Sequence, residues 1–167
     1  MARLKKLGNL QGVGEITICQ IDDNYPRQLI PSPYDNWGEM AAMNKMHIER
    51  WCIKLAAHGK PAIDVGYLSA HAVWYGPTVA SKAMNIGISI IAEFRGLGIG
   101  TMSQRLLAEH LHEQGYLRVE ASTDVENKPE QHALAGAGFQ FEGIARQAQG
   151  RADGIHDLQV WSHIANP

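Results

Sequence analysis

Short stretches that alternate apolar and polar residues dominate the first half of the chain, and this period of two is typical of half-buried β-strands. Three stretches show it, at residues 16–21, 50–56 and 63–74, and a fourth, more continuously apolar strand is expected at residues 85–91. Three prolines between residues 25 and 36 exclude one long helix there, and a short helix is expected from Trp37 to about Met46. The pattern predicts a strand-rich first half.

The period of the apolar residues changes after the fourth strand. Helical spacing relates Ile99, Met102, Leu106, Leu107 and Leu111, and Gly115 is placed to end that helix in a left-handed cap. A fifth strand is expected at residues 117–122, a short helix from about Pro129 to Ala137, and a final hairpin with strands near residues 139–144 and 158–163. Only one strand–helix–strand unit occurs, so the order predicts a mixed α+β sheet rather than a doubly wound parallel one.

Length and charge narrow the class of protein. The 167 residues suffice for about one domain, which we expect at residues 15–167 behind a flexible N-terminal segment, residues 1–14. With 15 Lys and Arg against 17 Asp and Glu, no excess of positive charge indicates a nucleic-acid or membrane partner. The two cysteines, Cys19 and Cys52, form neither a disulfide framework nor a zinc site. We expect a cytoplasmic protein without a metal or a membrane span.

The stretch from the fourth strand into the following helix contains the candidate chemistry. There a buried strand leads through Arg95-Gly96-Leu97-Gly98-Ile99-Gly100-Thr101 into an amphipathic helix. Free N–H groups and the helix dipole favour an anion at such a helix start, and glycines let the backbone approach it closely. Arg95 adds a planar cation that suits phosphate oxygens. This arrangement predicts a phosphate or pyrophosphate site.

Three kinds of phosphate-binding loop can be compared with this one. A P-loop needs a lysine before Thr101, which the chain lacks. A dinucleotide fingerprint needs glycine at Thr101 or at Ser103, depending on where it starts, and so fails both ways. The third pattern, Arg/Gln-x-x-Gly-x-Gly/Ala, is matched in full by Arg95, Gly98 and Gly100.

With this loop the sequence resembles the GNAT superfamily of acyl-CoA-dependent N-acetyltransferases. Asn127, followed eleven and twelve residues later by Gly138-Phe139, is similar to a second signature of that family. The part of the chain after this signature most resembles the Rim-type branch of the family, on the basis of Glu142 to Arg146, Asp157 and Trp161. The resemblance implies a GNAT-like, mostly antiparallel seven-stranded sheet flanked by helices and splayed between the fourth and fifth strands.

The resemblance also implies a set of residues that bind acetyl-CoA as co-substrate. Backbone groups near Ile90 would pair with the pantetheine arm, and Asn127 would hydrogen-bond the cofactor from the opposite lip of the cleft. Arg95 would lie beside the pyrophosphate, which the loop N–H groups would hold, those of Gly96, Leu97, Gly98, Ile99, Gly100 and Thr101.

Two positions depart from the family pattern. The tyrosine that many members use to protonate the departing thiolate is replaced by Leu134, and the serine often found three residues after the asparagine is replaced by Glu130. No catalytic residue can therefore be named from the sequence.

The function implied is transfer of an acetyl group from acetyl-CoA to a primary amine, by direct attack with both substrates bound. The missing tyrosine leaves open a non-catalytic acyl-CoA-binding regulatory module. The acceptor, a small molecule or a protein N-terminus, is not named by the sequence, and a homodimer stays open. Trp37 and Tyr75 lie in regions where the family builds its acceptor pocket.

Overall fold

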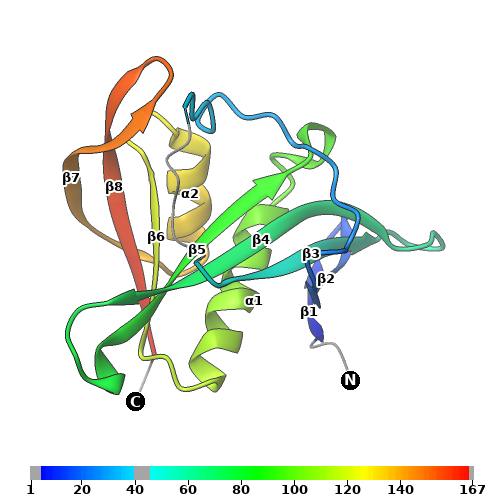
Figure 1. The fold of residues 1–167 in the computed structure, drawn as a ribbon. Helices are drawn as coiled ribbons and strands as arrows, with labels where there is room; N and C mark the ends of the chain where they lie inside the picture. The colour runs from blue at the N-terminus through cyan, green and yellow to red at the C-terminus, as the bar shows by residue number, and fades with distance from the viewer. Residues whose placement is uncertain (1–4, 40–45, 166–167) are drawn as a thin grey trace.

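The computed structural model describes residues 5–39 and 46–165, which form one eight-stranded sheet, two α-helices and two short 3-10 turns (Figure 1). The strands are β1 (Lys5–Leu10), β2 (Gly14–Ile21), β3 (Ile48–Ala56), β4 (Ile63–Trp74), β5 (Lys82–Ile90), β6 (Arg118–Asp124), β7 (Gln140–Arg151) and β8 (Gly154–Ile164). The helices are α1 (Ile99–Glu113) and α2 (Lys128–Gly136), and the 3-10 turns are η1 (Val79–Ser81) and η2 (Ala92–Phe94). The strand order is β1-β2-β3-β4-β5-β6-β8-β7.

The sheet is split in its middle, between β5 and β6. Every other neighbouring pair is antiparallel, whereas β5 and β6 are parallel and pair only from Met84 with Val119 to Ile86 with Ala121. Beyond Ile86 the two strands diverge (Figure 1). This confirms the predicted mixed, mostly antiparallel sheet with a splay between the strands expected as fourth and fifth.

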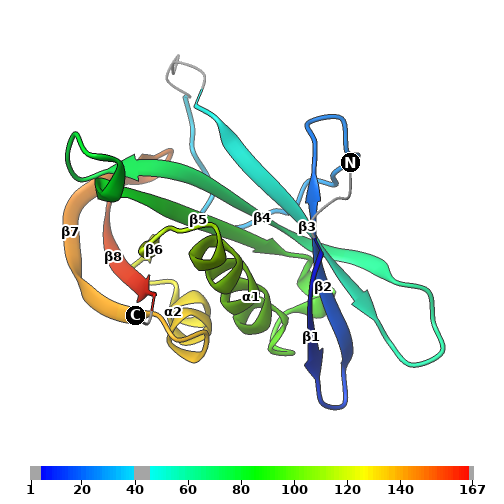
Figure 2. The ribbon, with the colours of Figure 1, turned by 90° about the horizontal axis from the view of Figure 1, so that it is seen from below.

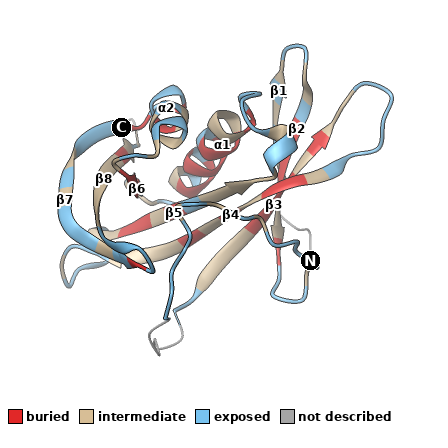
Figure 3. Cartoon of the chain, turned by 90° about the horizontal axis from the view of Figure 1, so that it is seen from above, coloured by how far each residue is buried: buried red, intermediate tan, exposed pale blue. Residues whose placement is uncertain are grey.

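Helix α1 organises the core. Both helices lie on the same face of the sheet (Figure 2), and the buried residues gather where α1 meets the strands (Figure 3). Leu107 and Leu111 are fully buried there, against strand residues such as Trp51 and Ile53. Gly115 (φ +94°), two residues past the last helical residue Glu113, terminates α1. There the N–H groups of Gly115 and Tyr116 donate to the carbonyls of His112 and Leu111. These two hydrogen bonds form a Schellman motif, the left-handed cap predicted at Gly115.

The N-terminal region differs from expectation. Residues 5–10 lie within the segment expected to be flexible, yet they form β1, and the sheet has eight strands rather than seven. β1 pairs with β2 and also packs on α1, so closely that a Cβ on Gly8 would lie 2.6 Å from the Met102 sulfur. Lys6 forms an ion pair with Glu113 at the end of α1. The segment has only two apolar residues, so no alternation marked it as a strand.

The short helix expected from Trp37 to Met46 falls mostly on residues 40–45, which lie outside the described residues. Residues 37–39 are not helical. The described part of the connection, residues 22–39 and 46–47, runs past the ends of β5 and α2 (Figure 1). Its residues 30–35, here called the strap, are important for the site.

Candidate active site

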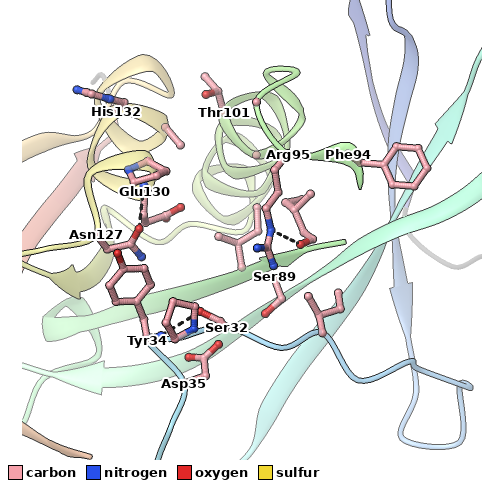
Figure 4. Close-up of a pocket in the computed structure, with 18 of the residues that line it drawn as sticks. Ser32, Tyr34, Asp35, Ser89, Phe94, Arg95, Thr101, Asn127, Glu130 and His132 are labelled. Atoms are coloured by element: carbon pink, nitrogen blue, oxygen red, sulfur yellow. Dashed lines mark hydrogen bonds between the residues drawn. The ribbon is translucent and has the colours of Figure 1, made fainter. Parts of the chain in front are cut away.

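The split between β5 and β6 opens into a cavity of about 540 Å³ (Figure 4). One wall is the end of β5 with the loop into α1, and the facing wall is the first turn of α2. The strap crosses between the two walls. It is held on one side by Arg95, which donates to the Pro31 carbonyl (3.2 Å), and on the other by Tyr34, whose hydroxyl donates to the Glu126 carbonyl (3.4 Å).

The α1 wall presents bare backbone. Gly98 is the N-cap in the left-handed conformation (φ +80°), and α1 has no side-chain cap. The first helical hydrogen bond runs from the Met102 N–H to the Gly98 carbonyl, so the N–H groups of Ile99, Gly100 and Thr101 have no acceptor within the helix. Uncapped N–H groups at the positive end of a helix dipole attract an anion.

Gly100 keeps this wall open. A Cβ at Gly100 would meet nothing closer than Ile88 Cδ1 at 3.8 Å and Ile90 Cγ1 at 3.9 Å. Its φ is not positive, so the backbone itself does not require glycine there. Among the described residues, the space beside Gly100 therefore opens into the cavity.

The end of β5 contributes an open strand edge. The Ile91 N–H donates to the Val65 carbonyl of β4 (2.9 Å). Because backbone groups of successive strand residues point to opposite sides, those of Ile88 and Ile90 face the split. The Ile90 carbonyl accepts from Arg95 Nε (2.9 Å). The Ile90 N–H and the Ile88 backbone groups therefore remain on the edge. The Arg95 guanidinium donates to the backbone carbonyls of Ile90 and Pro31.

The α2 wall presents side chains instead. Asn127 is the N-cap of α2, and its side-chain Oδ1 accepts from the Glu130 N–H (3.4 Å). The Glu130 carboxyl lines the cavity, and burial raises its pKa to about 7, opposed in part by the side-chain amide of Gln104. One turn further along, Leu134 is fully buried in the core. The position where the family pattern has tyrosine is therefore a packing position here.

A second, larger cavity of about 1100 Å³ adjoins the first on the side of β3 and β4. The two cavities share strap and β5 residues, namely Ile30, Ser32, Asp35, Ile88 and Ser89. Trp37 lines this second cavity. Tyr75 lines neither cavity, and its hydroxyl donates to Glu120 (2.6 Å).

Seven of the nine cofactor-binding residues predicted from the sequence line the first cavity: Ile90, Arg95, Gly96, Gly98, Gly100, Thr101 and Asn127. The other two lie elsewhere, with Leu97 exposed and Ile99 buried in the core, so only their backbones could contribute. The sequence did not indicate Tyr34 or Asp35, because the strap that carries them has no motif. Among the described residues no group of His, Cys, Asp and Glu side chains could hold a metal ion.

The region of His156 and Asp157 has a structural role. His156 Nδ1 lies 3.0 Å from Asp124 Oδ2, and Asp124 also forms a buried ion pair with Arg151. The Asp157 carboxylate accepts from the backbone N–H of Gln147 (2.7 Å), a residue with φ +51°. These contacts hold the ends of β6, β7 and β8 together beside the cavity.

Comparison with known proteins identifies the family. Residues 16–140 match the model of the acetyltransferase (GNAT) domain, so the chain belongs to the GNAT acetyltransferase family. No curated protein matches the chain by sequence. In the described part of the chain no helix is long and apolar enough to cross a membrane.

Solved structures share the fold. RimJ from Mycobacterium smegmatis in complex with CoA-disulfide is 17% identical, with a TM-score of 0.68 over 95% of this chain and 87% of that one. An acetyltransferase from Salmonella typhimurium that modifies the N-terminal serine of ribosomal protein L7/L12 is 22% identical, with a TM-score of 0.58. The microcin C7 self-immunity acetyltransferase MccE, in complex with acetyl-CoA and AMP, is 23% identical, also at 0.58. The last two matches cover 71% of this chain, which spans 64% and 61% of those proteins.

Proposed function

We propose that this protein transfers the acetyl group of acetyl-CoA to a primary amine, by direct attack with both substrates bound. The observation that carries the proposal is the uncapped, glycine-lined start of α1, which opens onto the split between β5 and β6. Together with membership of the acetyltransferase family, this cleft favours an enzyme over a module that only binds acyl-CoA. The missing tyrosine is the one argument for such a module. Other acidic side chains line the cavity, so the absence of the tyrosine does not exclude catalysis.

The chain's own residues divide the work of binding. The N–H groups of Ile99, Gly100 and Thr101 would bind the pyrophosphate, and the open edge at Ile88 and Ile90 would pair with the amides of the pantetheine arm. Acetyl-CoA supplies an activated acetyl thioester. The Ile90 N–H would donate to the acetyl oxygen as charge develops there, which is electrophilic stabilisation by a fixed dipole. Arg95 would act mainly by fixing the end of β5 and the strap.

The acceptor amine would approach through the second cavity and reach the first at Asp35 and Ser89, which line both. Holding two reactants in this geometry can contribute up to roughly 7–11 kcal/mol. The Salmonella relative modifies a ribosomal protein N-terminus, so a protein N-terminus is one acceptor class to test beside small-molecule amines. We place the reaction in the cytoplasm, in line with the free thiols of Cys19 and Cys52.

Thermal unfolding with and without CoA, followed by a thiol-release assay over a panel of amines, tests this proposal. CoA at a hundredfold excess over its Kd should stabilise the fold by about 2.7 kcal/mol. Free thiol should then appear only when acetyl-CoA and a suitable primary amine are both present. A folded protein without any shift in millimolar CoA would refute the cofactor assignment, and binding without thiol release would refute the transfer.

A further inference from the structure

We propose that the Glu130 carboxyl is the acid that donates a proton to the coenzyme A sulfur as the thioester breaks. The inference rests on the proposed function. It assigns the role that Leu134 cannot fill to a residue one helical turn away.

The position of Glu130 supports this role. Residues four apart lie on the same face of a helix, so Glu130 stands one turn before Leu134, closer to the start of α2. Leu134 is fully buried, whereas Glu130 lines the cavity (Figure 4). The Glu130 backbone is fixed by the bond from its N–H to Asn127 Oδ1. Across the same cavity lies the edge of β5 at Ile88 and Ile90, where the thioester would be held.

The protonation of Glu130 also fits the role. A carboxyl with a pKa of about 7 is half protonated at neutral pH, and its proton can move to a thiolate, whose pKa is higher. Burial is the main cause of the raised pKa, and the Gln104 amide from α1 opposes it. The titratable and charged groups that line the cavity with it are Tyr34 and Asp35 on the strap, Arg95 on the α1 loop and His132 on α2. Bound phosphates would add negative charge and favour the protonated form further.

The other groups in the cavity fit the role less well. His132 is exposed and points away from the cavity centre (Figure 4). Tyr34 already donates its hydroxyl proton to the Glu126 carbonyl. Asp35 has its pKa raised by burial, but the guanidinium of Arg151 favours its charged form. Of the two carboxyl groups that line the cavity, Glu130 is the one whose surroundings most favour the protonated form.

The amine nitrogen forms a bond to the acetyl carbon, the carbon–sulfur bond breaks, and its electron pair stays on sulfur. Glu130 gives its proton to that sulfur, leaving a free thiol and a carboxylate. The amine nitrogen loses one proton to water, and the Glu130 carboxylate regains one from solvent.

The test compares Glu130→Gln with wild type across pH 6–9, with Glu126→Gln as the control because Glu126 is exposed, adjacent and not part of the cavity wall. At pH 6.5 we expect Glu130→Gln to transfer at least ~100-fold more slowly, a typical contribution of a general acid. The wild-type rate divided by the Glu130→Gln rate should then fall roughly tenfold for each pH unit above about 7, because wild-type Glu130 loses its proton. Glu126→Gln should behave as wild type.

Two measurements without turnover accompany the rates. In the unliganded protein, the ¹³C resonance of the Glu130 carboxyl should titrate near pH 7 and vanish in Glu130→Gln. Calorimetry at pH 7.5 in buffers of different ionisation enthalpy should show that wild type takes up more protons on binding CoA than Glu130→Gln does. The CoA affinities of the two proteins should agree within about threefold.

A rate ratio that stays constant with pH, or a pH-dependent loss in Tyr34→Phe instead of Glu130→Gln, would overturn the assignment while leaving the acetyltransferase intact. Wild-type protein that binds no CoA or releases no thiol would overturn both proposals.

Discussion

The two walls of the cleft follow one plan, a strand that leads into a helix start, but the two helix starts present different groups. At α1 the N-cap is Gly98 and no side chain caps the first turn, so backbone N–H groups face the cavity. At α2 the Asn127 side chain caps the first turn and Glu130 projects beside it. An uncapped start suits an anion, whereas a capped start with a half-buried carboxyl of raised pKa suits a proton.

This contrast separates binding from proton transfer. The α1 wall would be sensitive to added volume, because its function depends on backbone N–H groups that line the cavity without a side-chain cap. The α2 wall would be sensitive to charge and packing, because its function depends on one carboxyl and the core beneath it.

The largest change is expected at the base of the α2 wall. Leu134→Ala removes a fully buried side chain and should lower the free energy of unfolding by about 2–5 kcal/mol, measured by urea denaturation. Ala135→Ser, on the exposed side of the same helix, should change it by less than about 0.5 kcal/mol. Equal small effects for both variants would mean that α2 is not anchored through Leu134.

The next effect concerns the charge of Glu130 and stability. Because burial raises its folded-state pKa to about 7, above the unfolded value, the folded state loses stability as pH rises from about 4.3 to 7 and levels off above. Glu130→Gln lacks this loss. Between about pH 4.3 and 7, the unfolding free energy of Glu130→Gln should therefore rise relative to that of wild type. The difference should be on the order of 3 kcal/mol at pH 8. A difference that does not vary with pH would contradict the raised pKa of Glu130.

Added volume on the α1 wall should weaken binding instead of folding. Gly100→Val places methyl groups where the cavity is open, so CoA affinity should fall at least ~100-fold, or about 2.7 kcal/mol, with little change in melting temperature without ligand. Gly150→Val, a strand glycine outside both cavities, is the control. Wild-type CoA binding by Gly100→Val would show that this wall does not hold the pyrophosphate.

Gly98→Val should also lower stability without ligand, because valine at φ +80° adds roughly 1–2 kcal/mol of backbone strain.

The smallest effect is expected at the α2 cap. Asn127→Ala should cost about 1 kcal/mol of unfolding free energy, because the Glu130 N–H loses its acceptor. Asn127→Asp keeps a capping oxygen and should recover most of that loss. If CoA affinity falls equally in both variants, Asn127 also donates to the cofactor through its amide, a role aspartate cannot take.

Features that depend on residues close together in the sequence could be predicted, whereas features that depend on tertiary contacts could not. The loop from Arg95 to Thr101 was found because its cation, its glycines and its helix are contiguous. β1 was missed because Gly8 and its polar neighbours become a strand only by packing on Met102 of α1. The strap was missed because Tyr34 and Asp35 reach the cavity through tertiary contacts.

In the sequence, Glu130 stands out as a departure from the family pattern but not as a titrating group. A glutamate in the first turn of a helix is ordinary in sequence, since the helix dipole favours it there. Its burial depends on a cavity that separate parts of the chain enclose, which no local pattern encodes.

The short ladder between β5 and β6 has a consequence for handling the protein at high concentration. After Ile86 and Ala121 the sheet contains two open backbone edges in its interior, in addition to the outer edges at β1 and β7. Open edges are templates on which other chains can add strands, and the edge of β5 includes the apolar Ile88 and Ile90. The split edge of β5 is therefore one further place, beside β1 and β7, at which another chain could add a strand. A ligand arm that fills the split removes this template, so coenzyme A in the storage buffer should suppress aggregation as well as raise the melting temperature.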